Sequence, residues 1–213
     1  MGPIGTFLLS IGESPGSALG REGQPTLWAV PSPVVPKGAD VTLRCQGQLE
    51  SETFQLWSDG EFRNETIASQ RVAEFVLRNV DDMTDARSYS CRYGRGPFWS
   101  EFSEALPLVV TGAFPKPYIS ALPPSKISPG STVNICCQMP PRGPSQDYSF
   151  ALLEAQSLKP WKRQNPARIR ALFSLLSVRA QDAGNYSCIY YNKTAPYRGS
   201  QPSQALELTV LGD

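Results

Sequence analysis

The sequence contains no histidine in its 213 residues. Serine and cysteine hydrolases generally use an imidazole as their base, and most catalytic zinc sites use imidazole ligands. The usual forms of both kinds of active site are therefore excluded. The glycine-rich phosphate loops of nucleotide-dependent enzymes are missing as well. We therefore expect a protein that is not an enzyme and that uses no cofactor or metal ion.

Long hydrophobic runs and a strong excess of one charge are also missing. The longest apolar stretches, Thr6–Ile11 and Leu106–Val110, are far shorter than the roughly 18 residues that a membrane-spanning helix requires. The formal net charge is only +1, which gives no reason to expect a nucleic acid as partner. Hydrophobic residues make up 40% of the chain, which is enough for a packed core. We expect a folded chain, either secreted or part of a receptor, with no membrane-spanning segment.

What the sequence does contain is an internal repeat. Residues 99–112 resemble residues 199–212, and residues 85–91 resemble residues 182–188. Within each copy, short segments alternate apolar and polar residues, and proline and glycine separate them, which is typical of β-strands. Many short strands in copies of about 100 residues predict two consecutive β-sandwich domains.

The cysteines support the same interpretation. Each copy has two cysteines at the ends of predicted strands, and a tyrosine stands two positions before each second cysteine. This spacing is typical of the tyrosine corner in the immunoglobulin fold. We therefore predict an all-β chain of two tandem immunoglobulin-like (C2-type) domains in an oxidising compartment. The predicted disulfides are Cys45–Cys91 and Cys137–Cys188, and the corner tyrosines are Tyr89 and Tyr186.

The repeat also predicts the domain boundaries. We place the first domain at residues 25–112 and the second at residues 113–213. Residues 1–24 resemble neither copy, and we expect a leader remnant or a disordered tail there. Residues 112–117 form a connection so short and so rich in proline that the domains should meet at a fairly fixed elbow.

Cys136 is the odd cysteine. If Val133, Ile135 and Cys137 point into the core, Cys136 points outward. One interpretation is an unpaired, half-buried thiol, and the alternatives are an intermolecular disulfide or a reactive thiol.

Several segments together resemble one receptor family, the leukocyte receptor cluster. They read LWAVPSPVVPKGADVTLRCQG, FQLW, AEFVLRNV, SYSCRYG and WSEFSEALPLVVTG. The family includes the leukocyte and killer-cell immunoglobulin-like receptors, the Fc alpha receptor, platelet glycoprotein VI, the osteoclast-associated receptor and the myeloid T-cell-interacting activating receptor. The resemblance covers roughly residues 25–212. Residues 99–103 are close to the family's Trp-Ser-x-x-Ser motif, whereas residues 199–203 lack the tryptophan, which leaves the packing of that strand open.

The resemblance implies a function as well as a fold. Members of the family mostly bind proteins, namely class I histocompatibility molecules, antibody Fc or collagen, and often signal through an adaptor chain. It therefore implies the extracellular, ligand-binding part of a leukocyte-type immune receptor, whose signalling parts are absent from this sequence. The alternative is a secreted plasma binding or inhibitory protein similar to alpha-1-B-glycoprotein.

Two segments are candidate ligand-binding sites. The predicted loop at residues 92–98 combines aromatic, arginine and glycine residues, a composition favoured at interfaces, although it also suits an ordinary hairpin. The second segment is a basic loop at residues 159–170, which suits an acidic protein or an acidic glycan but could also be merely solvated. The candidate residues are Tyr93, Arg95 and Phe98 in the first segment and Trp161, Lys162 and Arg163 in the second.

Three sequons predict N-linked glycans. Asn64 and Asn192 fall in predicted loops, and Asn185 falls on the predicted strand beside a disulfide, pointing outward. A glycan covers the surface around it, so these sites limit where a partner can bind.

Overall fold

The structure is a computed structural model, and most of its regular elements are strands. Residues 1–22, most of the expected leader or tail, lie outside the described part. In that part, no helix is long and apolar enough to cross a membrane. The described residues are 23–48, 53–124, 126–141, 147–155, 158–164 and 169–211.

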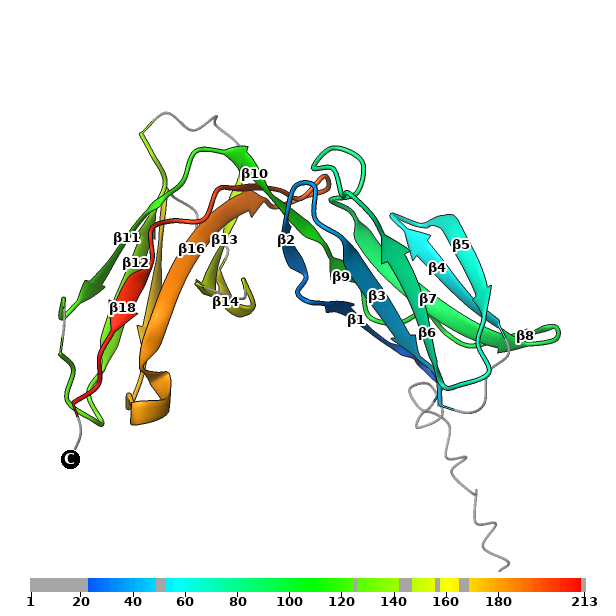
Figure 1. Cartoon of the computed structure of the whole chain (residues 1–213), viewed down its shortest axis with the longest axis horizontal. Coiled ribbons are helices and arrows are strands. Elements are labelled where there is room, and N and C mark those ends of the chain that lie inside the picture. The colour runs from blue at the N-terminus through cyan, green and yellow to red at the C-terminus, as the bar shows by residue number, and fades with distance from the viewer. Residues whose placement is uncertain are drawn as a thin grey trace, which may run out of the picture.

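The first domain is a sandwich of two antiparallel sheets (Figure 1). It contains β1 Thr26–Val30, β2 Val34–Pro36, β3 Val41–Gln46, β4 Thr53–Ser58, β5 Glu61–Ile67, β6 Val72–Leu77, β7 Ser88–Arg95, β8 Phe98–Trp99 and β9 Leu106–Pro107. One sheet has the order β1-β3-β6. The other has the order β5-β4-β7-β8, with β9 also paired to β7.

The second domain repeats this plan. It contains β11 Tyr118–Leu122, β12 Val133–Gln138, β13 Tyr148–Glu154, β14 Pro160–Gln164, β15 Arg170–Leu175, a short 3-10 helix η1 Ala180–Asp182, β16 Gly184–Asn192, β17 Arg198–Ser200 and β18 Leu206–Leu208. One sheet has the order β11-β12-β15. In the other, β13 pairs with both β14 and β16, and β16 also pairs with β17 and β18.

A disulfide joins the two sheets inside each domain. In β3 the side chains of Val41, Leu43 and Cys45 are buried while those between them are more exposed, as the alternation of this strand requires. β12 repeats the pattern. The S–S distances are 2.06 Å for Cys45–Cys91 and 2.00 Å for Cys137–Cys188.

A buried tyrosine fixes the corner before each second cysteine. The Tyr89 hydroxyl donates to the carbonyl of Asp85 at 3.0 Å, and the Tyr186 hydroxyl donates to that of Asp182 at 2.7 Å. Burial raises the pKa of both tyrosines to about 12. Both hydroxyls therefore stay protonated and act as donors at neutral pH.

One strand crosses the elbow and pairs with both domains. β10 Val109–Phe114 runs parallel to β2 of the first domain on one side and to β17 of the second domain on the other. Strands β14-β13-β16-β17-β10-β2 thus form one sheet through both domains, with β10 at the top of the arch in Figure 1. The expected boundary at residue 112 falls within this strand.

An apolar cluster fills the elbow. Val34 and Val109 of the first domain pack against Ala151, Leu153 and Ile189 of the second, and all five are nearly inaccessible to solvent. The opposite faces of β13 and β16 pack into the core of the second domain. These two strands are therefore buried on both sides, which explains why their sequences show almost no alternation.

A buried carboxylate adds a charged contact across the elbow. Asp82 of the first domain, 3% exposed, accepts hydrogen bonds from Arg198 Nε of the second domain at 2.6 Å and from Lys37 Nζ at 2.7 Å. The guanidinium of Arg198 also lies over the Phe114 ring, 5.4 Å from its centre. The backbone N–H of Tyr197 donates to the carbonyl of Ala86 at 2.7 Å. Polar and apolar contacts together hold the two domains at a defined angle.

Candidate functional site

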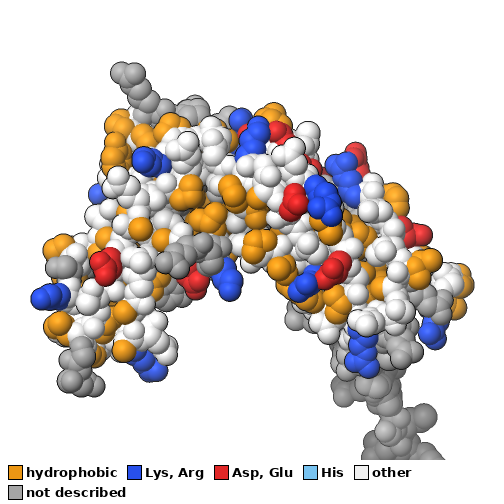
Figure 2. Space-filling view, in the orientation of Figure 1, with side chains coloured by type: hydrophobic (Ala, Val, Ile, Leu, Met, Phe, Trp, Pro, Cys, Tyr) orange, Lys and Arg blue, Asp and Glu red, His pale blue; other side chains and the backbone are white. Residues whose placement is uncertain are grey.

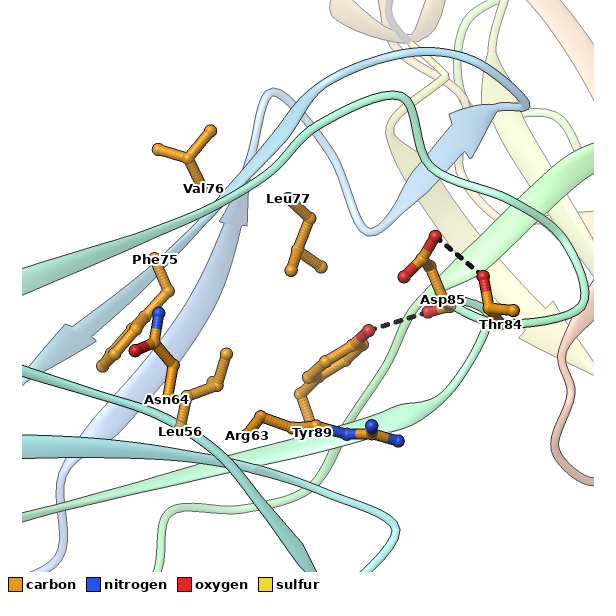
Figure 3. A pocket seen from close by; sticks show the side chains of 9 residues that line it. All are labelled: Leu56, Arg63, Asn64, Phe75, Val76, Leu77, Thr84, Asp85 and Tyr89. Carbon is orange, nitrogen blue, oxygen red and sulfur yellow. Dashed lines mark hydrogen bonds between the residues drawn. The ribbon is translucent and has the colours of Figure 1, made fainter.

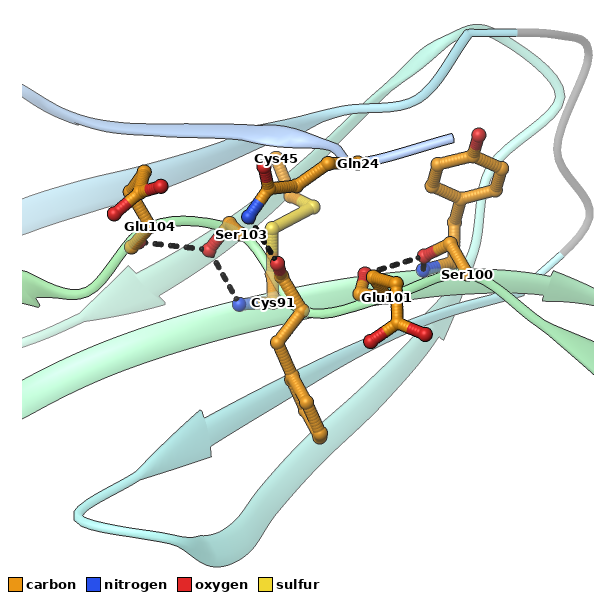
Figure 4. The surroundings of a disulfide bond; sticks show 9 residues. Gln24, Cys45, Cys91, Ser100, Glu101, Ser103 and Glu104 are labelled. Carbon is orange, nitrogen blue, oxygen red and sulfur yellow. Dashed lines mark hydrogen bonds between the residues drawn. A yellow bond between two sulfur atoms is a disulfide. The ribbon is translucent and has the colours of Figure 1, made fainter. Parts of the chain in front are cut away.

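The Trp-Ser-x-x-Ser-like segment, residues 99–103, is hydrogen-bonded to β7 through Ser100 and Ser103 (Figure 4). The Ser100 hydroxyl accepts from the N–H of Tyr93 at 3.1 Å, and the Ser103 hydroxyl accepts from the N–H of Cys91 at 3.0 Å. Each hydroxyl also donates to the carbonyl of the residue that follows it. The segment is thereby held beside the disulfide, and Trp99 and Phe102 project from a fixed backbone.

Those two aromatic side chains surround an arginine on the outer face of the β5-β4-β7-β8 sheet. The Arg92 guanidinium lies 5.1 Å from the ring centre of Trp57, 4.8 Å from that of Trp99 and 5.1 Å from that of Phe102. Its Nε donates to Gln55 Oε1 at 2.9 Å. Trp99 and Phe102 remain 37% and 38% exposed. We call these five residues the aromatic–arginine face.

Phe62 extends this face on β5. Its ring meets that of Trp57 edge to face, with centres 5.8 Å apart, and it is 52% exposed. Nothing in the local sequence predicts this grouping, because its members come from four separate segments. The signal that could have found it is the outward register of Trp57 and Arg92, which are not core positions in the alternation of β4 and β7.

The structure separates the three candidates in residues 92–98. Arg95 and Phe98 are cross-strand partners at the end of the β7–β8 hairpin, and both are exposed, Phe98 by 78%. Figure 2 shows hydrophobic side chains at this end of the first domain. Tyr93 instead packs against the first-domain core, with its ring centre 6.1 Å from that of Phe54. Of the three candidates, only Arg95 and Phe98 are exposed.

The basic segment of the second domain is in part a strand, and the expectation of a basic loop is wrong for residues 160–164. These residues form β14, an edge strand paired with β13. Lys162 and Arg163 are exposed there, but Lys162 Nζ also donates to the carbonyl of Ser174 in the opposite sheet at 2.6 Å. The side chain of Trp161 and the whole of Arg168 lie outside the described residues.

Asn64 and Asn192 lie on strands, and the expectation of loops is wrong for both. Asn64 is in the middle of β5, and Asn192 is the last residue of β16. Asn185 is exposed near the start of β16, paired with Glu207. The Nδ2 of Asn192 donates to the carbonyl of Pro196 at 3.1 Å.

Cys136 carries a free thiol and is half-buried. It lies on the outer face of the β11-β12-β15 sheet, between its cross-strand partners Ser120 and Leu172. In the first domain, Arg44 and Glu74 occupy the positions of Cys136 and Leu172, and their side chains form an ion pair of 2.8 Å.

The two domains differ in which sheet face is free. The apolar cluster of the elbow covers the outer face of β13 and β16, whereas the corresponding face of β4 and β7 carries the aromatic–arginine face. On these strands, the first domain thus leaves its outer face uncovered, whereas the second domain does not.

A family model agrees with this two-domain architecture, and several known proteins are similar in sequence. A family model for the immunoglobulin domain matches residues 24–110 and 116–210. Human immunoglobulin superfamily member 1 is 34% identical over 194 residues, which are 88% of this chain but only 14% of that protein. The human osteoclast-associated immunoglobulin-like receptor is 36% identical over 201 residues, 89% of this chain and 67% of the receptor. A solved structure, the human OSCAR ligand-binding domain, is 36% identical and covers 86% of this chain and 97% of its own, with a TM-score of 0.45.

The chain spans a small part of immunoglobulin superfamily member 1 and about two thirds of the osteoclast-associated receptor. Both of its domains match the same family model, and the identity extends over most of its length. The chain therefore belongs to the immunoglobulin-domain family and, within it, to the leukocyte receptor cluster of immunoglobulin-like receptors.

Proposed function

We propose that this chain is the ligand-binding ectodomain of a leukocyte-type immune receptor and that it recognises a protein ligand of the histocompatibility, antibody Fc or collagen class. The observation that carries the proposal is the aromatic–arginine face together with the exposed hairpin end at Arg95 and Phe98. Two disulfides support an extracellular location. Signalling would fall to an adaptor chain, reached through parts absent from this sequence.

The chemistry of this surface suits a protein partner. Aromatic and arginine side chains are enriched among the residues that dominate binding energy, because they bury a large area at a modest cost in conformational entropy. Arg92 is already held between three rings, so little side-chain freedom is lost when a partner covers it. A rigid sheet face with an exposed hairpin at its end can therefore bind a protein without rearranging.

The test is a binding screen against collagen, class I molecules and antibody Fc, followed by two double variants. We expect Arg95→Ala with Phe98→Ala to weaken binding at least tenfold, the effect of losing about 1.4 kcal/mol. We expect that binding to depend only weakly on salt, because most of the contact is apolar. Met83→Ala, at an exposed apolar residue away from this surface, is the matched control.

The second variant, Lys162→Glu with Arg163→Glu, tests the edge strand β14 instead. Binding that is lost in this variant and falls steeply with salt would move the site, including Trp161, to the second domain. Unchanged affinity in both double variants, with folding intact, would overturn the proposed surface.

A further inference from the structure

Asn64 is exposed on the edge strand β5, and its side chain lies on the inner side of the sheet. Its cross-strand partner is Leu56, which is 2% exposed and faces the core. The next pair along is Trp57 with Phe62, so Arg63 is an extra residue that forms a β-bulge. Directly paired residues share one side of a sheet, so the bulge puts Phe62 on the outer face and Asn64 on the inner side.

A cavity of about 300 Å³ opens at this place, where β5 and β6 leave the side of the sandwich unclosed (Figure 3). Its apolar wall includes Leu77, which lies on the same inner side of β6 as the buried Phe75. Its polar groups come mainly from the start of β7 and the turn before it. The lining residues are Leu56, Arg63, Asn64, Phe75, Val76, Leu77, Thr84, Asp85 and Tyr89.

The Asn64 amide is oriented so that a sugar on it faces the cavity. Its Oδ1 accepts the N–H of Glu65 at 2.8 Å, which fixes the amide plane, and its Nδ2 lies toward Phe75 (Figure 3). In Figure 3 the amide lies at the Phe75 end of the cavity, and Thr84 and Asp85 lie at the other end. Thr66 completes the sequon on the same strand.

We propose that Asn64 carries an N-linked glycan whose first N-acetylglucosamine occupies this cavity and closes the open side of the first domain. In the attachment step, Nδ2 bonds to C1 of a lipid-diphosphate-linked oligosaccharide, one amide proton is released, and the lipid diphosphate leaves. The acetamido methyl and the apolar face of the sugar then cover Leu77. Its hydroxyl groups face Arg63 and the Thr84–Asp85 pair.

The physical basis is the match between a sugar and this cavity. N-acetylglucosamine has an apolar ring face and methyl group together with polar hydroxyl groups, and the cavity offers one wall of each kind. Its volume is at the lower end of the range for small-molecule sites, which fits one sugar rather than a whole glycan. The remaining sugars would extend into solvent, away from the aromatic–arginine face on the opposite side of the sheet.

The test uses the protein secreted from cells that make only high-mannose glycans, with Asn185→Gln and Asn192→Gln as background. Three forms are compared: untrimmed, trimmed by endoglycosidase H to a single N-acetylglucosamine, and Asn64→Gln. We expect the first two to share one Tm and the third to melt about 2–4 °C lower. In NMR spectra of the trimmed form, the acetamido methyl should show nuclear Overhauser effects to Leu77.

Two further variants separate the cavity from the strand. Leu77→Ser, at the apolar wall of the cavity, should reduce the Tm difference between the trimmed form and the form without glycan. Ile67→Ser, at an exposed residue of β5 that does not line the cavity, should leave this difference unchanged. Unmodified Asn64 in peptide mass spectra would overturn the proposal, as would equal Tm values for all three forms or absence of the Overhauser effects.

Discussion

At the scale of single residues, Ser100, Ser103 and Ser203 of the Trp-Ser-x-x-Ser-like segments each bond to both backbone groups of a neighbouring strand residue. The N–H of Ser103 donates to the carbonyl of Cys91, and the Ser103 hydroxyl accepts the N–H of Cys91. Ser203 does the same for Cys188 in the second domain. A side chain thus replaces part of the strand pairing beside each disulfide.

We expect Ser103→Ala to lower the free energy of unfolding by about 1–3 kcal/mol, because the buried N–H of Cys91 loses its acceptor. Urea denaturation followed by tryptophan fluorescence measures this loss. Ser90→Ala, at a half-exposed residue of β7 next to Cys91, is the control. Equal losses in the two variants would show that the Ser103 hydroxyl has no special role.

Residue-scale prediction from the sequence succeeds where the pattern is local. The alternation in Val41–Cys45 and its repeat is enough to predict sandwich strands and an immunoglobulin-like fold. The Arg92 environment could not be predicted, because its rings come from distant segments. The inward turn of Asn64 could not be predicted either, because it depends on which residue of β5 is left unpaired in the bulge.

At the scale of elements, a glycine explains why the second domain lacks the tryptophan of the motif. Gly199 follows Arg198 as Trp99 follows Phe98, but it lies against β10. A Cβ atom on Gly199 would stand 3.0 Å from Val109 Cγ1 and 3.5 Å from the carbonyl oxygen of Val110. In the first domain Trp99 covers Arg92, whereas in the second the glycine admits a strand from the other domain.

We expect Gly199→Val to destabilise the protein by about 1–3 kcal/mol, because the added atoms must separate β17 from β10. Calorimetry measures the stability, and hydrogen exchange at the N–H of Val110, which donates to the carbonyl of Tyr197 at 3.3 Å, reports the local opening. Gln201→Val, at an exposed position two residues later, is the control. Unchanged exchange at Val110 in Gly199→Val would contradict this account.

Strand β13 shows that a lack of alternation in a sequence is itself informative. Ser149, Ala151 and Leu153 are buried as fully as Phe150 and its inward neighbours. A run without alternation predicts burial on both faces, and here the second face is the contact with the first domain. Which surface covers it could not be predicted, because Val34 and Val109 resemble any other strand residues in the sequence.

At the scale of the whole molecule, the charged contact at Asp82 sets how firmly the domains are joined. Burial by itself would raise the pKa of Asp82, but hydrogen bonds from Lys37 and Arg198 outweigh it and hold the pKa below the usual 3.8. The folded pKa is thus lower than the unfolded one. The stabilisation is therefore complete above about pH 3.8 and is lost as the pH falls through the lower, folded value.

We expect Asp82→Ala to lower the free energy of unfolding at pH 7 by about 1.5–3 kcal/mol, the usual contribution of hydrogen bonds to a charged group. The stability of the variant should also fall less steeply than that of the parent below pH 3.8. Nitrogen-15 relaxation should give one rotational correlation time for both parent domains and a larger difference between them in the variant. Glu61→Ala, which removes an exposed ion pair with Arg63, is the control.

The sheet that continues through the elbow determines how the molecule responds to a pull. If a cell-bound ligand tugs on the β7–β8 hairpin while the far end of the second domain is anchored, tension acts along the axis of the arch. β10 and β17 are parallel, so the force slides one strand along the other and strains their shared hydrogen bonds together instead of unzipping them singly. The elbow would then resist extension and transmit tension from one domain to the other.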